Sequence, residues 1–112
     1  MKRLHEFGPF WVDPDRSLLL RGAEPVALTA KAFETLMVLI QHRPETVSKD
    51  ELLKTVWPDT FVEEANLTQH VSMLRKALGE RPQDRRYIVT VPGRGCRFVA
   101  SESAGILGGN AE

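Results

Sequence analysis

The strongest structural signal in this chain lies in two stretches, FVEEANLTQHVSMLRKALG at residues 61–79 and YIVTVPGRGCRF at residues 87–98. The first repeats apolar side chains at the spacing of one helix face, which predicts an amphipathic helix. The second holds two β-rich runs joined by Pro and Gly, which predicts a hairpin from Tyr87 to Ala100. A helix that fits a groove, followed by a hairpin with a basic tip, is an arrangement that grips duplex DNA. The apolar helix positions are Leu67, Val71, Leu74 and Leu78.

Capping signals bound this helix. Thr60 and Glu63 form a capping box that predicts a start at Thr60, and Gly79 is the stop signal. A shorter helix precedes it, with a capping box of Ser48 and Glu51, and is predicted to run to about Trp57 before Pro58. Two helices joined by a short turn form a helix-turn-helix.

The N-terminal part reads as a small antiparallel sheet. Three apolar runs, at residues 7–12, 18–20 and 26–28, are separated by turn-forming residues at 13–15 and 21–24.

A first helix is predicted to follow this sheet from Ala30 to His42, with Thr29 as its cap and Pro44 as its stop. Its apolar positions recur at helical spacing and predict a core helix. They are Phe33, Leu36, Met37 and Ile40.

The charge of the chain is uneven although its formal net value is zero. Residues 70–98 hold seven Lys and Arg against two Asp and Glu, residues 1–69 hold eight against eleven, and residues 99–112 none against two. The excess positive charge therefore coincides with the helix and the hairpin, as in nucleic-acid-binding domains. A solvated basic surface with no partner is the alternative that charge alone leaves open.

The exposed side of the predicted third helix has Gln69 and Met73 at its centre. Gln can pair with adenine, and apolar atoms can contact the thymine methyl, but plain exposure or a dimer contact would equally suit Met73. At the hairpin tip, Arg94 stands between two glycines, where it can reach a phosphate or a minor groove. The alternative is an ordinary turn that happens to contain an arginine. The exposed side comprises Ala65, Gln69, Ser72, Met73 and Lys76, flanked by Thr68 and Arg75 on one edge and by Asn66 and His70 on the other.

Composition narrows the class of protein. The 112 residues fit one domain, Cys96 has no disulfide partner, and no apolar run approaches the ~18 residues of a membrane span. These features favour a soluble, cytoplasmic protein that makes no membrane contact through this segment. Residues 101–112 have the composition of a flexible tail or of a linker to a missing part.

No enzyme or metal site is indicated. Cys96 has no triad-like arrangement around it and is predicted to be a structural thiol in a strand. The three histidines are widely separated and have no Cys or carboxylate at ligand spacing. We therefore expect no catalytic residue, no metal and no cofactor.

In this order and spacing, these segments resemble the OmpR/PhoB-type winged-helix DNA-binding domain, the C-terminal domain of transcriptional regulatory proteins. The resemblance covers residues 7–99 and is carried by FGPF at 7–10, LT at 28–29, VSKDELLKTVWPD at 47–59 and the two opening stretches. It implies an α+β fold, a winged helix-turn-helix in residues 1–100 with a four-stranded N-terminal antiparallel sheet, three helices and a C-terminal hairpin wing. It also implies that the third helix enters the major groove of double-stranded DNA and that the wing addresses the neighbouring minor groove.

The resemblance assigns roles to individual positions. Gln69 and Met73 fall at base-facing sites, and Trp57 matches an aromatic whose indole N–H reaches the DNA backbone. The loop before the third helix matches the segment that contacts RNA polymerase in activators, and it comprises Pro58, Asp59, Thr60, Phe61 and Val62. The positions expected at DNA are Trp57, Asn66, Thr68, Gln69, His70, Ser72, Met73, Arg75, Lys76, Thr90, Arg94 and Arg97.

The chain departs from the family pattern at four positions. Cys96 stands where tyrosine is usual, and basic residues frequent in the family are replaced at Ala65, Ser72 and Met73. Phosphate contacts are therefore expected mainly from Arg75, Lys76 and the wing. For a monomer with about four such contacts, the slope of log affinity against log salt should be about 3 to 4 in magnitude.

Domain order points to the CadC/ToxR-like group, if Met1 is the native start, because members of that group carry the winged helix first. In one case, the full protein is tethered to a membrane through a C-terminal region that is missing here. In the other case, the chain is a free-standing protein. Two copies on tandem half-sites about one helical turn apart are expected by resemblance. The rival interpretation is a protein-interaction module without its own DNA specificity, which would use Trp57, Phe61 and Met73 as an exposed apolar surface.

Overall fold

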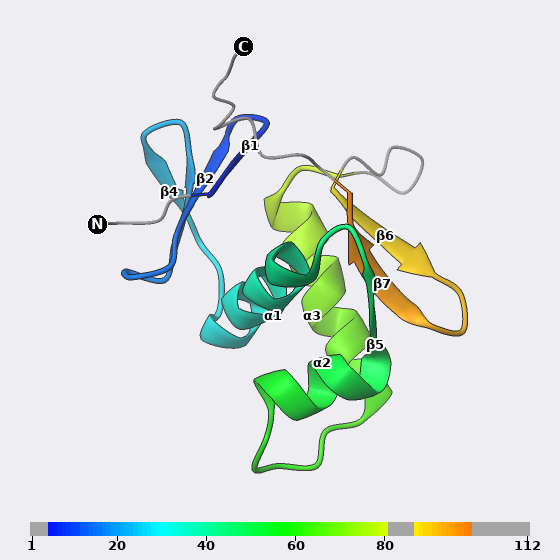
Figure 1. The fold of residues 1–112 in the computed structure, drawn as a ribbon. Coiled ribbons are helices and arrows are strands. Elements are labelled where there is room, and N and C mark those ends of the chain that lie inside the picture. Colours follow the sequence, from blue (N-terminus) through cyan, green and yellow to red (C-terminus); the bar gives the residue numbers. More distant parts are fainter. Residues whose placement is uncertain (1–4, 81–86, 100–112) are drawn as a thin grey trace. The chain divides into compact units, whose positions relative to one another are not determined.

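A computed structural model of the protein describes residues 5–80 and 87–99 (Figure 1). These residues belong to two compact units that divide between Ala27 and Leu28. The predicted tail and the predicted hairpin end at Ala100 lie outside the described residues. The elements of the described residues are β1 (His5–Phe7), β2 (Phe10–Asp13), β3 (Leu18–Arg21), β4 (Glu24–Val26), α1 (Ala30–His42), β5 (Thr46–Ser48), α2 (Lys49–Val56), α3 (Glu64–Ala77), β6 (Ile88–Val91) and β7 (Gly95–Phe98).

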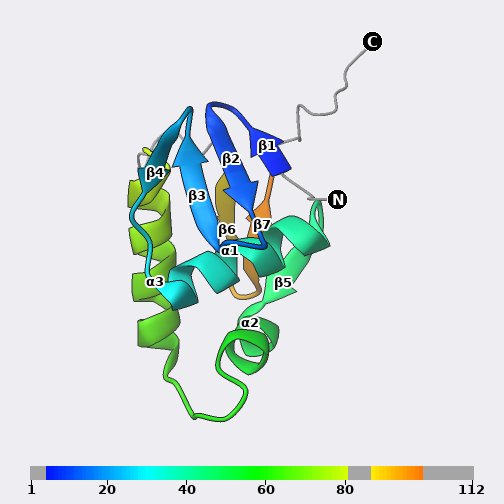
Figure 2. The same cartoon turned by 90° about the vertical axis from the view of Figure 1, so that its left-hand side faces the viewer.

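The first unit contains an antiparallel four-stranded sheet in the order β1-β2-β3-β4 (Figure 2). The apolar run at residues 7–12 is divided between two strands, β1 and β2. Gly8 has a φ of 55° and Pro9 follows it, so the chain turns between two strands and Phe7 pairs with Phe10. This turn produces the four-stranded sheet that the resemblance implied, which is therefore confirmed.

The first two helices of the second unit begin at the predicted caps. Thr29 Oγ1 accepts a hydrogen bond from the Ala32 N–H at 3.1 Å, and Ser48 Oγ accepts one from the Glu51 N–H at 3.0 Å. α1 ends at His42, as predicted, and α2 ends at Val56, just before its predicted end at about Trp57. Their apolar faces form much of the core of this unit. Its fully buried side chains include Leu36, Leu39, Ile40, Leu52, Leu74, Ile88 and Phe98.

The start of α3 differs from the prediction. The helix begins at Glu64, and the N-cap is Glu63, whose backbone is extended and whose side chain makes no cap hydrogen bond. The capping box predicted for Thr60 and Glu63 is therefore wrong. Glu64 lies in the first turn, where its carboxylate is stabilised by the positive end of the helix dipole and by Lys49 Nζ at 3.4 Å.

A short strand that the sequence analysis missed, β5, completes the wing sheet. β7 lies between β5 and β6, and Val47 of β5 pairs with Cys96 of β7. β5 is only three residues long and ends at the cap of α2, so it carries no readable alternation. Gly95 is required here, because a Cβ on it would lie 1.9 Å from the Val47 carbonyl oxygen.

Candidate nucleic-acid interface

α3 buries the predicted face and exposes most of the opposite one. Leu67, Val71, Leu74 and Leu78 are all buried. Met73, predicted at the centre of the exposed side, is instead half-buried, and so are His70 and Arg75. The exposed surface of the helix is therefore more polar than the prediction. It consists of Glu64, Ala65, Asn66, Thr68, Gln69, Ser72 and Lys76.

Trp57 and His70, two predicted DNA-contacting residues, lie together at one end of this surface. Their rings meet edge to face with centroids 5.1 Å apart, and Lys31 Nζ lies 6.0 Å from the Trp57 ring centroid. Lys31 also donates a hydrogen bond to the Val56 carbonyl at 2.7 Å, at the negative end of α2. His70 Nδ1 donates to the Asn66 carbonyl at 2.9 Å. These contacts fix both rings before any ligand arrives.

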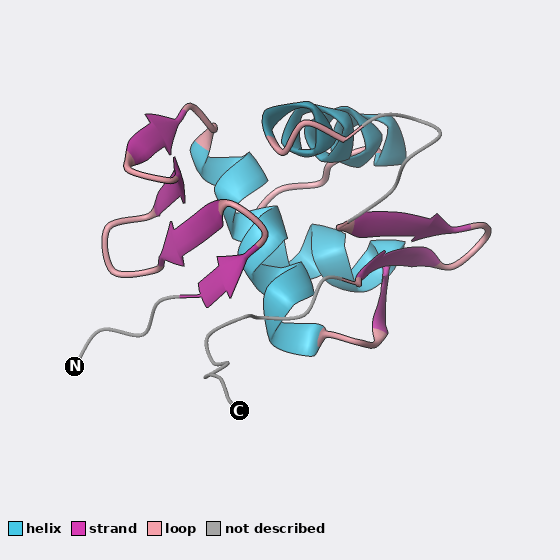
Figure 3. Ribbon diagram, turned by 90° about the horizontal axis from the view of Figure 1, so that it is seen from above, coloured by secondary structure: helices cyan, strands magenta, loops and turns pink. Residues whose placement is uncertain are grey.

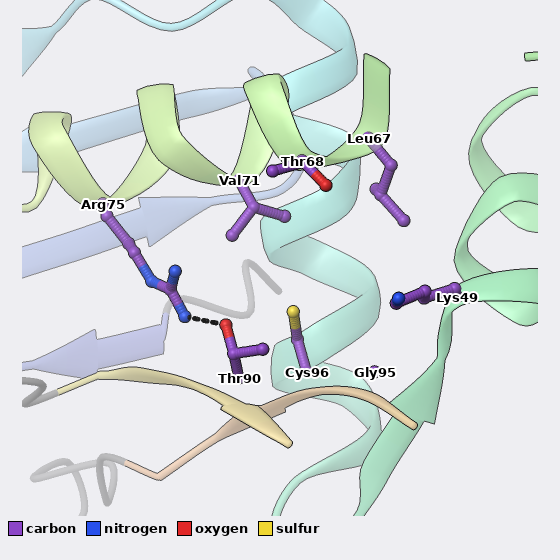
Figure 4. Close-up of a pocket in the computed structure, with 8 residues that line it drawn as sticks. All are labelled: Lys49, Leu67, Thr68, Val71, Arg75, Thr90, Gly95 and Cys96. Atoms are coloured by element: carbon purple, nitrogen blue, oxygen red, sulfur yellow. Dashed lines mark hydrogen bonds between the residues drawn. The ribbon is translucent and has the colours of Figure 1, made fainter. Parts of the chain in front are cut away.

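Arg75, predicted to contact phosphate, points toward the wing instead. Its side chain is 13% exposed, and its Nη2 donates to Thr90 Oγ1 at 2.6 Å and to the Ile88 carbonyl at 3.3 Å (Figure 4). Its Nε lies 3.8 Å from Glu80 Oε1. The structure thus brings two predicted DNA-contacting residues, Arg75 and Thr90, together by bonding them to each other.

Glu80, which the sequence analysis did not consider, is the buried partner of this arginine. The Glu80 N–H donates to the Arg75 carbonyl at 2.9 Å, and the Gly79 N–H donates to the Lys76 carbonyl at 3.0 Å. With Gly79 at a φ of 76°, these bonds form a Schellman motif, which turns Glu80 back over the end of α3. Its Oε2 then accepts the backbone N–H groups of Tyr87 and Ile88. In the sequence, Gly79 indicated only the end of the helix. A glycine at that position also permits the Schellman motif that places Glu80.

The wing tip is a tight turn from Val91 to Arg94 that extends away from the helices (Figure 1 and Figure 3). The Arg94 N–H donates to the Val91 carbonyl at 2.9 Å, with Pro92 and Gly93 between them as in a type II turn. The Arg94 carbonyl in turn accepts the Lys49 N–H at 3.2 Å, which ties the tip to the start of α2. The side chains of Thr90, Arg94 and Arg97 are exposed.

A cavity of about 140 Å³ separates α3 from the hairpin (Figure 4). The Cys96 sulfur points across it toward α3. Burial raises the pKa of the Cys96 thiol. The positive charges of Arg75 and Lys49 and a hydrogen bond with Thr90 lower this pKa by a smaller amount. The thiol is therefore held in its neutral form, as befits a packing residue. The lining residues are Lys49, Leu67, Thr68, Val71, Arg75, Thr90, Gly95 and Cys96.

The loop from Pro58 to Val62 presents a different kind of surface. Phe61 is 89% exposed, the largest exposure of a bulky apolar side chain among the described residues. It borders a groove of about 280 Å³ between the loop and α2. The lining residues are Asp50, Leu53, Lys54, Trp57, Pro58, Thr60, Phe61 and Val62.

Residues 5–80 and 87–99 contain no cluster of three or more His, Cys, Asp or Glu side chains that could hold a metal ion. Within those same ranges, no helix has the length and apolar character needed to cross a membrane.

A helix-turn-helix followed by a hairpin packed beside its second helix defines a winged-helix domain. Residues 23–98 match the family described as "Transcriptional regulatory protein, C terminal". The chain belongs to this OmpR/PhoB-type family, and both the resemblance and the fold class predicted from sequence are confirmed. The family comprises DNA-binding domains of transcription regulators and is not a class of enzymes.

Known regulators and solved domains agree with this assignment. HilA of Salmonella typhimurium strain LT2 is 39% identical over 92 residues, which are 82% of this chain and 16% of HilA. CadC of Escherichia coli K12 is 33% identical over 93 residues, 82% of this chain and 18% of CadC. The DNA-binding domain of E. coli CadC superposes with a TM-score of 0.76 at 30% identity, covering 90% of this chain and 96% of that domain. The Klebsiella pneumoniae RstA DNA-binding domain, solved in complex with the RstA box, gives 0.74 at 28% identity, covering 86% and 96%. The chain thus spans less than a fifth of HilA and CadC.

Proposed function

We propose that this chain binds double-stranded DNA in a sequence-specific manner, as the DNA-binding domain of a bacterial transcriptional regulator. In this proposal α3 enters the major groove and the wing tip lies at the adjacent minor groove. The observation that carries it is the continuous exposed polar side of α3 beside a wing whose exposed tip residue is Arg94. The RstA domain, of the same fold, was solved with its DNA box, which supports duplex DNA as the ligand.

We assign base contacts to one group of residues and phosphate contacts to another. Gln69 lies at the centre of the exposed side of α3, where an amide can pair with adenine, and Asn66, Thr68 and Ser72 lie beside it. Met73 is half-buried and contributes apolar contact at the edge of this group. The second group would contact the phosphate backbone and fix the register of the domain. It comprises Trp57, His70, Lys76, Arg94 and Arg97.

The test is selection of binding sites from a pool of random duplexes, at low and at near-physiological salt. An enriched motif that loses affinity on Gln69→Ala, with Gln41→Ala as the matched control at an exposed position of α1, supports the proposal. We also expect two copies of the motif about one helical turn apart, because we propose that two chains bind tandem half-sites. Failure to enrich any motif in either buffer would leave the interaction-module alternative as the better account.

We further propose that the loop from Pro58 to Val62 contacts a protein partner, with RNA polymerase as the first candidate. The supporting observation is Phe61, which is 89% exposed beside an apolar groove. We expect Phe61→Ala to leave DNA affinity unchanged within about twofold and to reduce transcription from a reconstituted promoter by roughly tenfold. Equal transcription by both proteins at saturating DNA occupancy would exclude the loop as a contact.

The boundary of the DNA-binding region is also a proposal. We propose that residues 1–100 suffice for DNA binding and that residues 101–112 are not needed for it. A chain shortened to residues 1–100 should then bind the selected duplex as tightly as the 112-residue chain.

A further inference from the structure

We infer that Glu80 and Arg75 are positioning residues that fix the wing against α3, so that helix and wing meet DNA as one rigid unit. This inference rests on the proposed DNA binding. It assigns Glu80 a part in recognition and gives Arg75 a different role from the phosphate contact that the sequence suggested.

The outer edge of the wing sheet is bound by these two side chains. The strand order is β5-β7-β6, so one edge of β6 has no neighbouring strand in the described part of the chain. At Ile88, the N–H donates to Glu80 Oε2 at 3.0 Å and the carbonyl accepts from Arg75 Nη2 at 3.3 Å. The two side chains therefore satisfy both backbone groups of Ile88, as a neighbouring strand would. The wing is docked to α3 through main-chain bonds, which fix its position along the helix.

Both charged side chains are largely removed from solvent. The Glu80 side chain is 0% exposed and that of Arg75 is 13% exposed. A buried carboxylate is tolerated when it is paired and hydrogen-bonded, and Glu80 is both. Neither side chain can reach a DNA duplex without breaking these bonds, so neither is available as a simple surface charge.

The Arg75 guanidinium also holds β6 at a second position. A single nitrogen, Nη2, donates to the Ile88 carbonyl at 3.3 Å and to Thr90 Oγ1 at 2.6 Å. These two bonds, one to the main chain and one to a side chain two residues further on, hold this part of β6 against α3. Thr90 lies one residue before Val91, where the tip turn begins. The orientation of Arg94 at the tip is therefore linked to Glu80 through Arg75 and β6.

The test uses the duplex that the unaltered chain selects from a random pool. Glu80→Gln removes a negative charge, so charge alone predicts tighter DNA binding. We expect the opposite, roughly tenfold weaker binding to the selected duplex and a smaller loss on a scrambled one, because the wing contributes phosphate contacts to both. The matched control is Glu45→Gln, the same change at an exposed residue between α1 and β5. Thr90→Val removes the hydroxyl that accepts from Arg75 and should also weaken binding to the selected duplex. Thr90→Ser keeps the hydroxyl and should bind this duplex as the unaltered chain does.

A double-mutant cycle identifies the mechanism. If Glu80 acts by placing the wing, Arg94→Ala will cost less affinity in the Glu80→Gln background than in the unaltered chain. Additive losses would overturn the inference, and so would full affinity in a folded Glu80→Gln variant.

A measurement on the free protein separates this inference from the proposed function. Residual dipolar couplings of backbone amides report the orientation of β6 and β7 relative to α3. We expect the hairpin of the Thr90→Val and Glu80→Gln variants to become less ordered relative to α3, and unchanged couplings would overturn the inference whether or not DNA binds. If the unaltered chain selects no duplex while the couplings change, the proposed function fails and the positioning role of Glu80 stands.

Discussion

The two ends of the wing use the same kind of side chain for different purposes. At its base, Arg75 is 13% exposed and bonds to Ile88 and Thr90 of β6. At its tip, Arg94 is exposed, and its backbone alone holds the turn through Val91 and Lys49. The difference lies in the surroundings, since only Arg75 has a buried carboxylate nearby. A count of basic residues therefore overstates the number of cations that this surface offers to DNA.

The largest expected difference between the two arginines is in folding stability. Arg75→Ala should lower the free energy of unfolding by about 3–5 kcal/mol, because it leaves the Glu80 carboxylate buried beside a lost cation. Arg94→Ala should change it by no more than about 0.5 kcal/mol, because the side chain is exposed. Urea unfolding followed by circular dichroism measures both. Equal losses in the two variants would contradict the contrast between base and tip.

Features of the fold that depend on neighbouring residues were predictable from the sequence, and features that depend on distant ones were not. Caps made within one turn were predicted, since Thr29 and Ser48 accept the expected N–H groups. Thr60 does not cap α3 although its motif is of the same kind, because the helix begins later, at Glu64. Glu64 lies 3.4 Å from Lys49 Nζ, fifteen positions away, a contact that the local motif does not encode.

The candidate site was predictable in outline for the same reason. Helical periodicity identified the buried and exposed sides of α3, with Met73, His70 and Arg75 as half-buried exceptions. The inward turn of Arg75 depends on Thr90 and Ile88, which are fifteen and thirteen positions away, and no periodicity in either segment encodes that pairing. β5 was missed because a three-residue strand is recognisable only through its pairing with β7.

The next difference is in the dependence of DNA binding on salt. Arg94→Ala should reduce the slope of log affinity against log salt by about 0.9, the value for one lost phosphate contact. Arg75→Lys retains a positive charge but replaces the guanidinium that bonds to Ile88 and Thr90. It should therefore weaken DNA binding and leave the slope unchanged, because no phosphate contact is lost. Fluorescence anisotropy with the selected duplex at several salt concentrations measures both slopes. Should Arg94→Ala leave the slope unchanged, the tip makes no phosphate contact.

The smallest expected effect concerns Cys96, on the strand between base and tip. Burial raises the pKa of its thiol above the ordinary value of 9.0. The folded state therefore favours the neutral thiol, whose contribution to stability is complete below pH 9.0 and is lost as the pH rises through the folded-state pKa. The difference in unfolding free energy between the unaltered chain and Cys96→Ala should accordingly be constant near neutral pH and shrink at alkaline pH.

Urea unfolding of both proteins from about pH 7 to about pH 10.5 tests this expectation, since the other titrating groups are common to the two chains. Arg94→Ala is the matched control, because its difference from the unaltered chain should stay constant over the same range. A Cys96→Ala difference that persists at the alkaline end would mean that the thiolate is accommodated in the cavity between α3 and the hairpin. Arg75 and Lys49, which favour the thiolate, would then outweigh burial, and the base of the wing would be more open to ions than its packing suggests.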